Sequence, residues 1–594
     1  MKSLRSMFSH DKDEEINQEE QATAAAVPSR AMSSTSVENE EKQSAGLEPE
    51  PESDSLSTNK NENDSSSTKD ADTAKTSDAA DVDQQGYPTG IPFLVIVIGL
   101  CLAVLLVALD NTIIATAIPK ITDHFRALND VGWYGSSYLL TTCAFQLIFG
   151  KFYTFFPIKW VFLLAIVVFE VGSAVCGAAP TSNALIVGRA IAGLGSAGIF
   201  SGALVIIAYA VPLHKRPVYN GLFGSMYGVA SVAGPLMGGA FTDHISWRWC
   251  FYINLPFGAF TILAILVFLK SPKQSSTGST SWKQRMNQLD IIGTSVFIPA
   301  IVCLLLALQW GGTRYAWSSA RIIALFVIFA ILIIIFLGVQ VWKGDYATVP
   351  PRIVRQRSMA FAILFALLLG ASFFIVVYFI PVWFQAIKGV SATKSGIMSI
   401  PMVLSLVVFS LLCGTAVTVF GHYVPFCFLA SILSAIGAGL LTTFNTSTGH
   451  AKWIGYQVLY GAGIGAGMQM PVIAAQVVLT LDDIPVGTAV MIFAQTLGGA
   501  LFVSVAQNVF SNLLVKGIVK AGTGLDPNLV SNAGATNLKT MIPPQYLPQV
   551  QDAYSKALTQ TWYLCVATSA LSIIGAMGME WKSVKGKKLN VAAA

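Results

Sequence analysis

Charged side chains are scarce in this chain: 12% of its 594 residues are Asp, Glu, Lys or Arg, whereas 54% are hydrophobic. Ordinary soluble domains carry about 25% charged residues. A chain with so little charge cannot cover itself with polar side chains, and this argues against a soluble globular protein. The composition instead predicts a membrane protein.

Cysteine is also rare, and the eight cysteines include no C-x-x-C pair. The cysteines therefore predict neither the disulfide framework of a small secreted domain nor the paired ligands of a zinc site. All eight fall in or beside apolar runs, where cysteine acts as a small hydrophobic side chain. We therefore expect no metal and no cofactor.

Several catalytic signatures are missing as well. The sequence has no H-E-x-x-H, no G-x-S-x-G and no Walker lysine motif, and its six histidines are scattered. A membrane enzyme or an ATP-driven pump would be expected to carry such a motif. We therefore expect that the protein is not an enzyme and that proton motive force supplies its energy. A receptor or scaffold that transports nothing is equally disfavoured.

Residues 1–89 have almost no aromatic side chains, and they carry 20 acidic and 8 basic residues, a net charge of −12. Such a segment cannot bury enough apolar surface to offset the entropy lost on folding. We expect a disordered acidic cytoplasmic tail. It also lacks the basic start and apolar core of a signal peptide, so the first membrane span is the expected targeting signal.

Apolar runs of about 20 residues fill most of the remaining chain, and this is the length of a helix that crosses the hydrocarbon core. They predict an all-α polytopic membrane protein with fourteen transmembrane helices. The expected spans cover residues 91–118, 131–151, 160–179, 184–211, 219–242, 249–269, 290–310, 321–342, 359–385, 395–420, 423–443, 453–479, 486–508 and 561–580.

The distribution of Lys and Arg predicts the orientation. With both termini inside, the inner loops and the tail at 581–594 carry 16 basic residues, and the short outer loops carry 8. Basic residues favour the cytoplasmic side, so both termini are expected there. Residues 509–560 then form a long outer loop. Asn445, in the sequon NTS, also lies outside and is the expected glycosylation site.

Apart from charges at the terminal residues of a span, three charges fall inside the predicted spans: Asp110, Glu170 and Arg189. A charge at mid-membrane costs about 2.5–3.5 kcal/mol on insertion scales, so such residues usually face a bundle interior and serve function. Simpler roles exist for each. Asp110 could cap a neighbouring helix end, Glu170 could make a structural hydrogen bond, and Arg189 could snorkel to the nearer membrane surface.

Four motifs follow one another along the first half of the chain: LDNTIIATAIP (109–119), RAIAGLGSAG (189–198), GLFGSMYGVASVAGPLMGG (221–239) and WRWCFYINLPFG (247–258). Together they resemble the major facilitator superfamily, in particular its fourteen-span drug:proton antiporters and the fungal multidrug and toxin exporters among them. The likeness covers roughly residues 90–580.

The resemblance implies the major facilitator fold, with two six-helix bundles and two inserted spans. The N-terminal bundle would cover 90–270, the inserted spans 7 and 8 with their linkers 271–345, and the C-terminal bundle 346–580, including the long outer loop.

The same resemblance implies roles for individual residues. Asp110 and Arg189 match the acidic residue of span 1 and the arginine of span 4 that are associated with proton coupling, and Glu170 is a further candidate. One glycine of the antiporter motif in span 5 is replaced by Ala230. The loop GKFYTFFPIK after span 2 lacks the family's aspartate, so a gating salt bridge through that position is not expected. The matching antiporter-motif residues are Gly221, Gly234, Pro235, Gly238 and Gly239.

Aromatic and amide side chains, with no cluster of charges, are the other polar groups expected in the interior. They suit bulky, largely apolar ligands with a few hydrogen-bonding groups. The expected cavity residues are Tyr134, Tyr138, Gln146, Tyr378, Trp383, Gln385, Gln469, Gln476 and Gln495.

These features predict proton-coupled efflux of drugs, fungicides or secondary-metabolite toxins by alternating access. The alternative is a proton-coupled carrier of basic amino acids or iron chelates. The expected partners are a small-molecule substrate, protons and the lipid bilayer, with no nucleic acid, and the expected unit is a monomer. The plasma membrane is the expected location, with the vacuolar membrane as the alternative.

Overall fold

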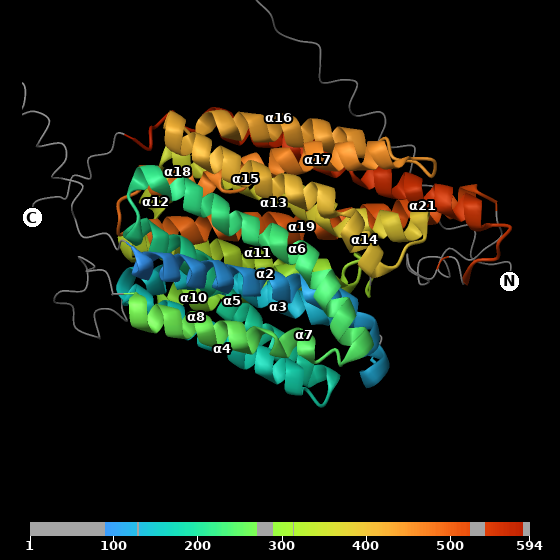
Figure 1. Ribbon diagram of the computed structural model, residues 1–594, viewed down its shortest axis with the longest axis horizontal. Helices are drawn as coiled ribbons and strands as arrows, with labels where there is room; N and C mark the ends of the chain where they lie inside the picture. The colour runs from blue at the N-terminus through green and yellow to red at the C-terminus, as the bar shows by residue number, and fades with distance from the viewer. Residues whose placement is uncertain are drawn as a thin grey trace, which may run out of the picture. The chain divides into compact units, whose positions relative to one another are not determined.

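The computed structural model of the protein describes residues 90–127, 130–269, 289–312, 314–522, 538 and 541–585. Throughout this part of the chain the regular elements are helices, and most of them run along one common axis (Figure 1). The expectations for the acidic tail, for most of the linker after span 6 and for the last nine residues lie outside the described residues.

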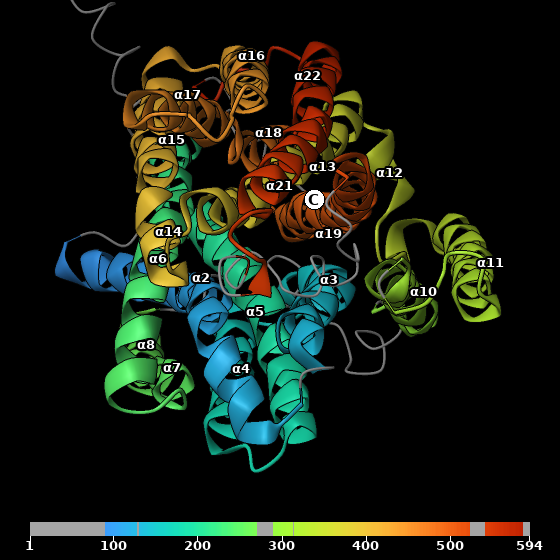
Figure 2. The ribbon, with the colours of Figure 1, turned by 90° about the vertical axis from the view of Figure 1, so that its right-hand side faces the viewer.

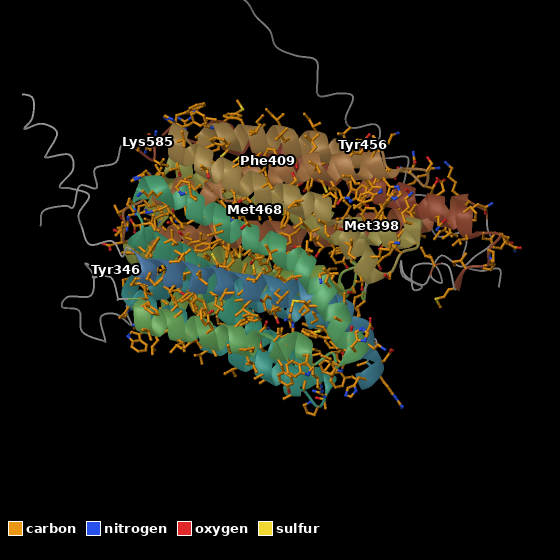
Figure 3. The ribbon with its side chains drawn as sticks, in the orientation of Figure 1. Tyr346, Met398, Phe409, Tyr456, Met468 and Lys585 are labelled. Atoms are coloured by element: carbon orange, nitrogen blue, oxygen red, sulfur yellow. The ribbon has the colours of Figure 1, made fainter. Side chains whose placement is uncertain are left out.

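Two opposite ends of the helix bundle can be recognised in Figure 3, and we name them after labelled residues. The Lys585 end is the end at which Tyr346 and Lys585 lie. The Met398 end is the opposite end, toward which Met398 and Tyr456 lie. The first helix also starts at the Lys585 end, where the ring of Phe93 packs edge-on against Tyr219. Both ends of the described chain therefore lie on one side, as an even number of crossings requires.

The first half of the protein is a bundle in which α2 packs against α6 and α8, α4 against α5, and α3 against α5. Helix α2 continues beyond the predicted end of span 1 because the backbone takes up the left-handed conformation only at Arg126. The helices are α2 (Ile91–Phe125), α3 (Val131–Phe155), α4 (Ile158–Ala178), α5 (Ser182–Ala210), η3 (Leu213–Lys215), α6 (Arg216–His244), α7 (Trp249–Tyr252) and α8 (Asn254–Phe268).

Two helices lie beside the bundle, α10 (Ile291–Trp310) and α11 (Ala320–Lys343), and Figure 2 shows them at its edge. Helix α10 contacts α3 and α19, whereas α11 packs mainly against α10. The short elements η5 (Gly344–Tyr346) and α12 (Pro351–Arg355) lead from this pair into the second half.

The second half repeats the packing of the first, with α13 against α19 and α22, α15 against α17, and α16 against α17 and α22. The two halves meet where α6 packs on α15 and α3 packs on α19. The helices are α13 (Arg357–Trp383), η6 (Phe384–Lys388), α14 (Ala392–Met398), α15 (Ile400–Phe420), α16 (Val424–Leu441), α17 (His450–Gly467), α18 (Met470–Val478), α19 (Ile484–Lys520), α21 (Leu547–Thr561) and α22 (Tyr563–Gly578).

Each of the fourteen expected spans coincides with a helix or a pair of consecutive helices, and twelve of these segments are long and apolar enough to cross a membrane. The other two are α3 and α6, with 25 and 29 residues. They carry many Gly, Ser and Thr residues at the contact between the halves, and this lowers their hydropathy. The count of fourteen spans stays a prediction.

The predicted long outer loop at 509–560 differs from the structure at both of its ends. Helix α19 continues to Lys520, and α21 begins at Leu547. Helix α21 carries many polar residues, and it buries one face that includes Val550, Tyr554 and Leu558. Amphipathic packing, and not apolar length, stabilises this helix.

Candidate functional site

The centre of the first half contains a buried ion pair between Asp110 of α2 and Arg189 of α5. Nη1 of Arg189 donates to Oδ2 of Asp110, and the two side chains are 1% exposed or less. Arg189 also donates through Nε to the carbonyl oxygen of Tyr134 at 2.8 Å, and its guanidinium lies 4.4 Å from the ring centroid of Tyr138. Arg189 is therefore held inside the bundle and does not snorkel to the membrane surface.

The second oxygen of Asp110 is held by an amide. Asn254, the first residue of α8, donates from Nδ2 to Oδ1 of Asp110 at 3.2 Å and lies 3.1 Å from Oγ of Ser173 on α4. Helices α2, α3, α4, α5 and α8 thus all supply groups to one site. Because each oxygen of Asp110 has its own partner, the carboxylate is fixed in position and does not serve as a helix-end cap.

A second carboxyl group lies beside this site. Glu170 is three residues before Ser173 on α4, its side chain packs against Gly258 of α8, and the residue is 9% exposed. Among the described residues, neither of its carboxyl oxygens has a hydrogen-bond partner. An unpaired buried carboxylate is costly, so the structural hydrogen bond considered for Glu170 is not what keeps it here.

The small residues of α6 allow it to lie directly against α2, one turn after Asp110. A methyl group at Gly234 would overlap Thr112, and one at Gly238 would overlap Thr116. Thr112 also donates a hydrogen bond of 2.9 Å to the carbonyl oxygen of Ala230. The opposite side of α6 faces the second half, where Gly221 packs against the carbonyl of Ser410, Gly239 lies near Thr393, and Pro235 lies near Gly396.

Gly234→Ala is expected to destabilise the protein by about 1–3 kcal/mol, because the added methyl group overpacks the contact between α2 and α6. The matched control is Gly135→Ala on α3, where an added Cβ would meet no atom within 4 Å. Thermal melting of the two purified variants in detergent is the measurement. Equal melting temperatures would show that the contact tolerates a methyl group.

Comparison with models of protein families identifies the family of this chain. The model described as the Major Facilitator Superfamily matches residues 100–503. The chain belongs to the major facilitator superfamily. It is therefore a membrane transporter and not an enzyme, as its sequence predicts, and the expected major facilitator fold is confirmed.

Relatives within the superfamily agree with this assignment. The MFS-type efflux pump MFS1 of Arthroderma benhamiae is 66% identical over 514 residues, which cover 86% of this chain and 96% of the relative. The efflux pump aflT of Aspergillus parasiticus is 52% identical over 504 residues, covering 85% and 98% of the two chains. The predicted likeness to fungal efflux transporters is confirmed.

Solved structures support the fold alone. The human organic anion transporter MFSD10 aligns with a TM-score of 0.52 at 14% identity, over 81% of this chain and all of that chain. The proton:xylose symporter XylE also gives a TM-score of 0.52, at 15% identity, over 83% of this chain and 98% of that chain.

The nine residues expected to line a cavity in this superfamily member do not gather in one place. Tyr134 and Tyr138 surround Arg189, and Tyr134 also pairs with Ser182 through its hydroxyl at 2.9 Å. Tyr378 is half-exposed. Three others make hydrogen bonds within the second half: Trp383 with Ser555, Gln385 with Ser395 and Gln495 with the carbonyl of Met468.

The remaining three amides lie toward the contact between the halves. Gln476 of α18 accepts from Asn220 of α6 at 3.2 Å, and Gln469 lies against Gly224 of the same helix. Gln146 of α3 is buried, and its amide nitrogen has no partner within the part of the chain that the structure describes. It lies one turn before Gly150, which packs on Ala489 of α19. The cavity itself stays a prediction.

The halves are also joined at the Lys585 end, without the loop aspartate that the family usually has there. Tyr209 of α5 donates through its hydroxyl to the carbonyl of Leu481 at 3.1 Å. Close by, Lys151 of α3 is buried. Asp290, the residue before α10, accepts hydrogen bonds from Gly293, Thr348 and Gln340.

Proposed function

We propose that this protein exports bulky, largely apolar small molecules in exchange for protons, by alternating access between its two halves. The observation that carries the proposal is the buried pair of Asp110 and Arg189. A pair of charges removed from water is weak evidence for stability, and inside a membrane bundle it marks a functional site. The names of the relatives, which are efflux pumps, support the direction of transport.

Asp110 is the proposed proton carrier. A proton that binds either oxygen of Asp110 removes the negative charge that holds the guanidinium of Arg189. The pair then ceases to tie α2 to α5. Proton binding and the relative position of these helices are therefore linked, as coupling requires.

The packing of α2 carries this change to the contact between the halves. Thr112, two residues after Asp110, is hydrogen-bonded to α6, and α6 packs on α15 of the second half. A shift of α2 would therefore also move α6, the helix at the contact around which the two halves would rock. Glu170 is the proposed second carboxyl, because it lies unpaired beside Ser173 and Asn254 and offers a place for a proton that leaves Asp110.

The proposed substrate site lies between the halves, where Gln146, Gln469 and Gln476 supply amide groups. Few fixed charges are present there, which suits apolar molecules with a few polar groups. One chain provides both halves, so a monomer is the proposed unit. The plasma membrane is the proposed location.

The test uses inverted membrane vesicles with an acidic interior and a panel of bulky, apolar fluorescent compounds. Wild-type protein is expected to accumulate members of the panel inside the vesicles, and an ionophore that collapses the pH gradient should release them. Labelled basic amino acids should not accumulate. Accumulation that survives collapse of the pH gradient would contradict proton coupling.

Glycosylation provides a separate test of orientation. Asn445 is exposed and lies in the connection between α16 and α17. Helix α16 begins near Gly421, which accepts a hydrogen bond from Val584, so this connection follows the far end of α16. The side-chain oxygen of Asn445 accepts hydrogen bonds from the amide and hydroxyl of Ser447 at 3.0 and 2.7 Å, which leaves the amide nitrogen without a partner in this part of the chain.

A glycosidase is expected to increase the electrophoretic mobility of the wild-type protein and to leave Asn445→Gln unchanged. Each protein is purified from the same eukaryotic host and compared with and without the enzyme. The acidic tail contains a second sequon, NDS at 63–65. A glycan on Asn63 would place this tail outside the cell and reverse the proposed orientation.

A further inference from the structure

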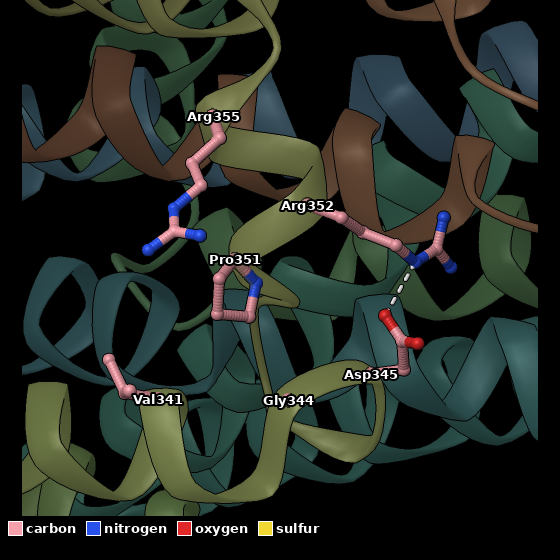
Figure 4. A pocket seen from close by; sticks show the side chains of 6 residues that line it. All are labelled: Val341, Gly344, Asp345, Pro351, Arg352 and Arg355. Atoms are coloured by element: carbon pink, nitrogen blue, oxygen red, sulfur yellow. Dashed lines mark hydrogen bonds and ion pairs between the residues drawn. The ribbon is translucent and has the colours of Figure 1, made fainter.

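A pocket of about 230 Å³ opens at the Lys585 end, where the inserted helix pair continues into the second half (Figure 4). It lies between the end of α11, η5 and α12, away from the buried ion pair. Its lining combines apolar and charged residues: Val341, Gly344, Asp345, Pro351, Arg352 and Arg355.

The two arginines of the pocket have different electrostatic surroundings. Arg352 donates to Asp345 at 2.8 Å and makes two parallel hydrogen bonds to Asp483 at 2.6 and 2.7 Å, so its charge is compensated within the protein. Arg355 is exposed and has no hydrogen bond or ion pair among the described residues. In Figure 4 its guanidinium extends over the side of the pocket that is closed by Val341 and Pro351.

Further basic residues lie near Arg355 in the sequence. Lys343 and Arg357 flank the pocket in the sequence, and the segment 341–357 contains four basic residues and one acidic residue. The charge of Arg352 is balanced by the two aspartates, whereas no acidic residue in the described ranges forms an ion pair with Arg355. The free cation of this site is therefore suited to an anion that comes from outside the protein.

The other half of the pocket is apolar and opens onto the surface of α11. Val341 and Trp342 are 70% and 73% exposed, and Tyr346 is also exposed. Tryptophan and tyrosine at the end of a membrane helix lie at the level of the lipid headgroups. From there, Leu337, Ile334 and Ile331 continue the exposed apolar face along the helix toward the membrane interior.

We propose that this pocket binds the headgroup phosphate of one anionic phospholipid, with Arg355 pairing to the phosphate and the acyl chains lying along α11. A free phosphate ion would use the arginine but not the apolar face. A zwitterionic lipid brings its own cation into a region that already has excess positive charge. Anionic lipids are concentrated in the cytoplasmic leaflet, which is the side proposed for the Lys585 end.

Such a lipid would sit where the inserted helices are connected to the transport core. Residues 344–355 hold η5 and α12, and Arg352 in this segment is tied to Asp483 just before α19. Occupation of the pocket therefore supports the segment that joins α11 to the second half. This inference concerns a different part of the protein from the proton site and does not depend on proton coupling.

The test measures binding of short-chain, water-dispersible phosphatidylserine to the purified full-length protein, by native mass spectrometry. Arg355→Gln is expected to weaken binding about fivefold, which corresponds to one basic residue near the lipid surface. Arg355→Lys should retain most of the binding. The control is Arg314→Gln, which changes an arginine in the connection between α10 and α11 at the Met398 end and should bind as the wild type does.

Three further measurements decide the ligand. Short-chain phosphatidylcholine is expected to bind more weakly than phosphatidylserine, and inorganic phosphate at the same concentration should neither bind nor compete. Competition by phosphate would mean a site for free anions and would overturn the lipid assignment. Equal phosphatidylserine binding by Arg355→Gln and the wild type would overturn the site, provided that both proteins melt at the same temperature.

Discussion

Asp110→Asn is expected to abolish accumulation driven by a pH gradient, with a loss of at least about 100-fold, because an amide cannot take up and release the proton. The substitution keeps the size of the side chain and one oxygen that accepts from Arg189. Transport is measured in inverted vesicles at matched protein amounts, with an imposed pH gradient and a compound that the wild type exports. Binding of the same compound is measured in detergent, where the variant should retain it.

Two further variants separate loss of coupling from loss of structure. Asp110→Asn leaves the guanidinium of Arg189 without its counter-charge, so Asp110→Asn combined with Arg189→Gln serves as a neutral, hydrogen-bonded pair. This double variant is expected to melt close to the wild type and still fail to transport. Gradient-driven accumulation by the single variant at the wild-type rate would reject Asp110 as the proton carrier, and Glu170→Gln would then be tested in the same assay.

The residues of this site that a sequence can predict are the charged ones, because a charge costs free energy inside a membrane. Asp110 and Arg189 stand out because a charge within an apolar run has to be compensated, and the structure pairs them. Asn254 carries no such signal, since an asparagine at the start of a helix has many ordinary roles. Its contact with Asp110 joins positions 144 residues apart and depends on how α8 packs against α2 and α4.

The same limit explains the scattered cavity residues. Hydropathy identifies a segment that crosses the membrane, but it does not say which side of the helix faces a cavity, a neighbouring helix or lipid. Trp383 and Gln495 therefore carry the same signal as Gln476, although the first two are bonded within the second half and only Gln476 lies against α6. Helix α21 was missed for a related reason, because its buried stripe alternates with polar residues.

Arg189→Ala is expected to lower both stability and transport, more severely than any other single change at this site. Removing one partner of a buried ion pair costs about 3–5 kcal/mol, because the remaining carboxylate of Asp110 is left without a counter-charge in a water-poor interior. The truncation also leaves a void beside the ring of Tyr138. It removes the hydrogen bond that the carbonyl of Tyr134 accepts from Arg189 in the wild type. Thermal melting in detergent and the vesicle assay give the two readouts.

Arg189→Lys tests whether charge alone is sufficient. Lysine keeps the positive charge, but a single ammonium group cannot reproduce the guanidinium's simultaneous contacts with Asp110, with the carbonyl of Tyr134 and with the ring of Tyr138. We expect stability between those of the wild type and Arg189→Ala, together with weak transport. If Arg189→Ala melts and transports as the wild type does, the pair with Asp110 is neither a structural nor a coupling element. If Arg189→Lys recovers stability but not transport, the fork geometry of arginine, and not its charge, is what coupling requires.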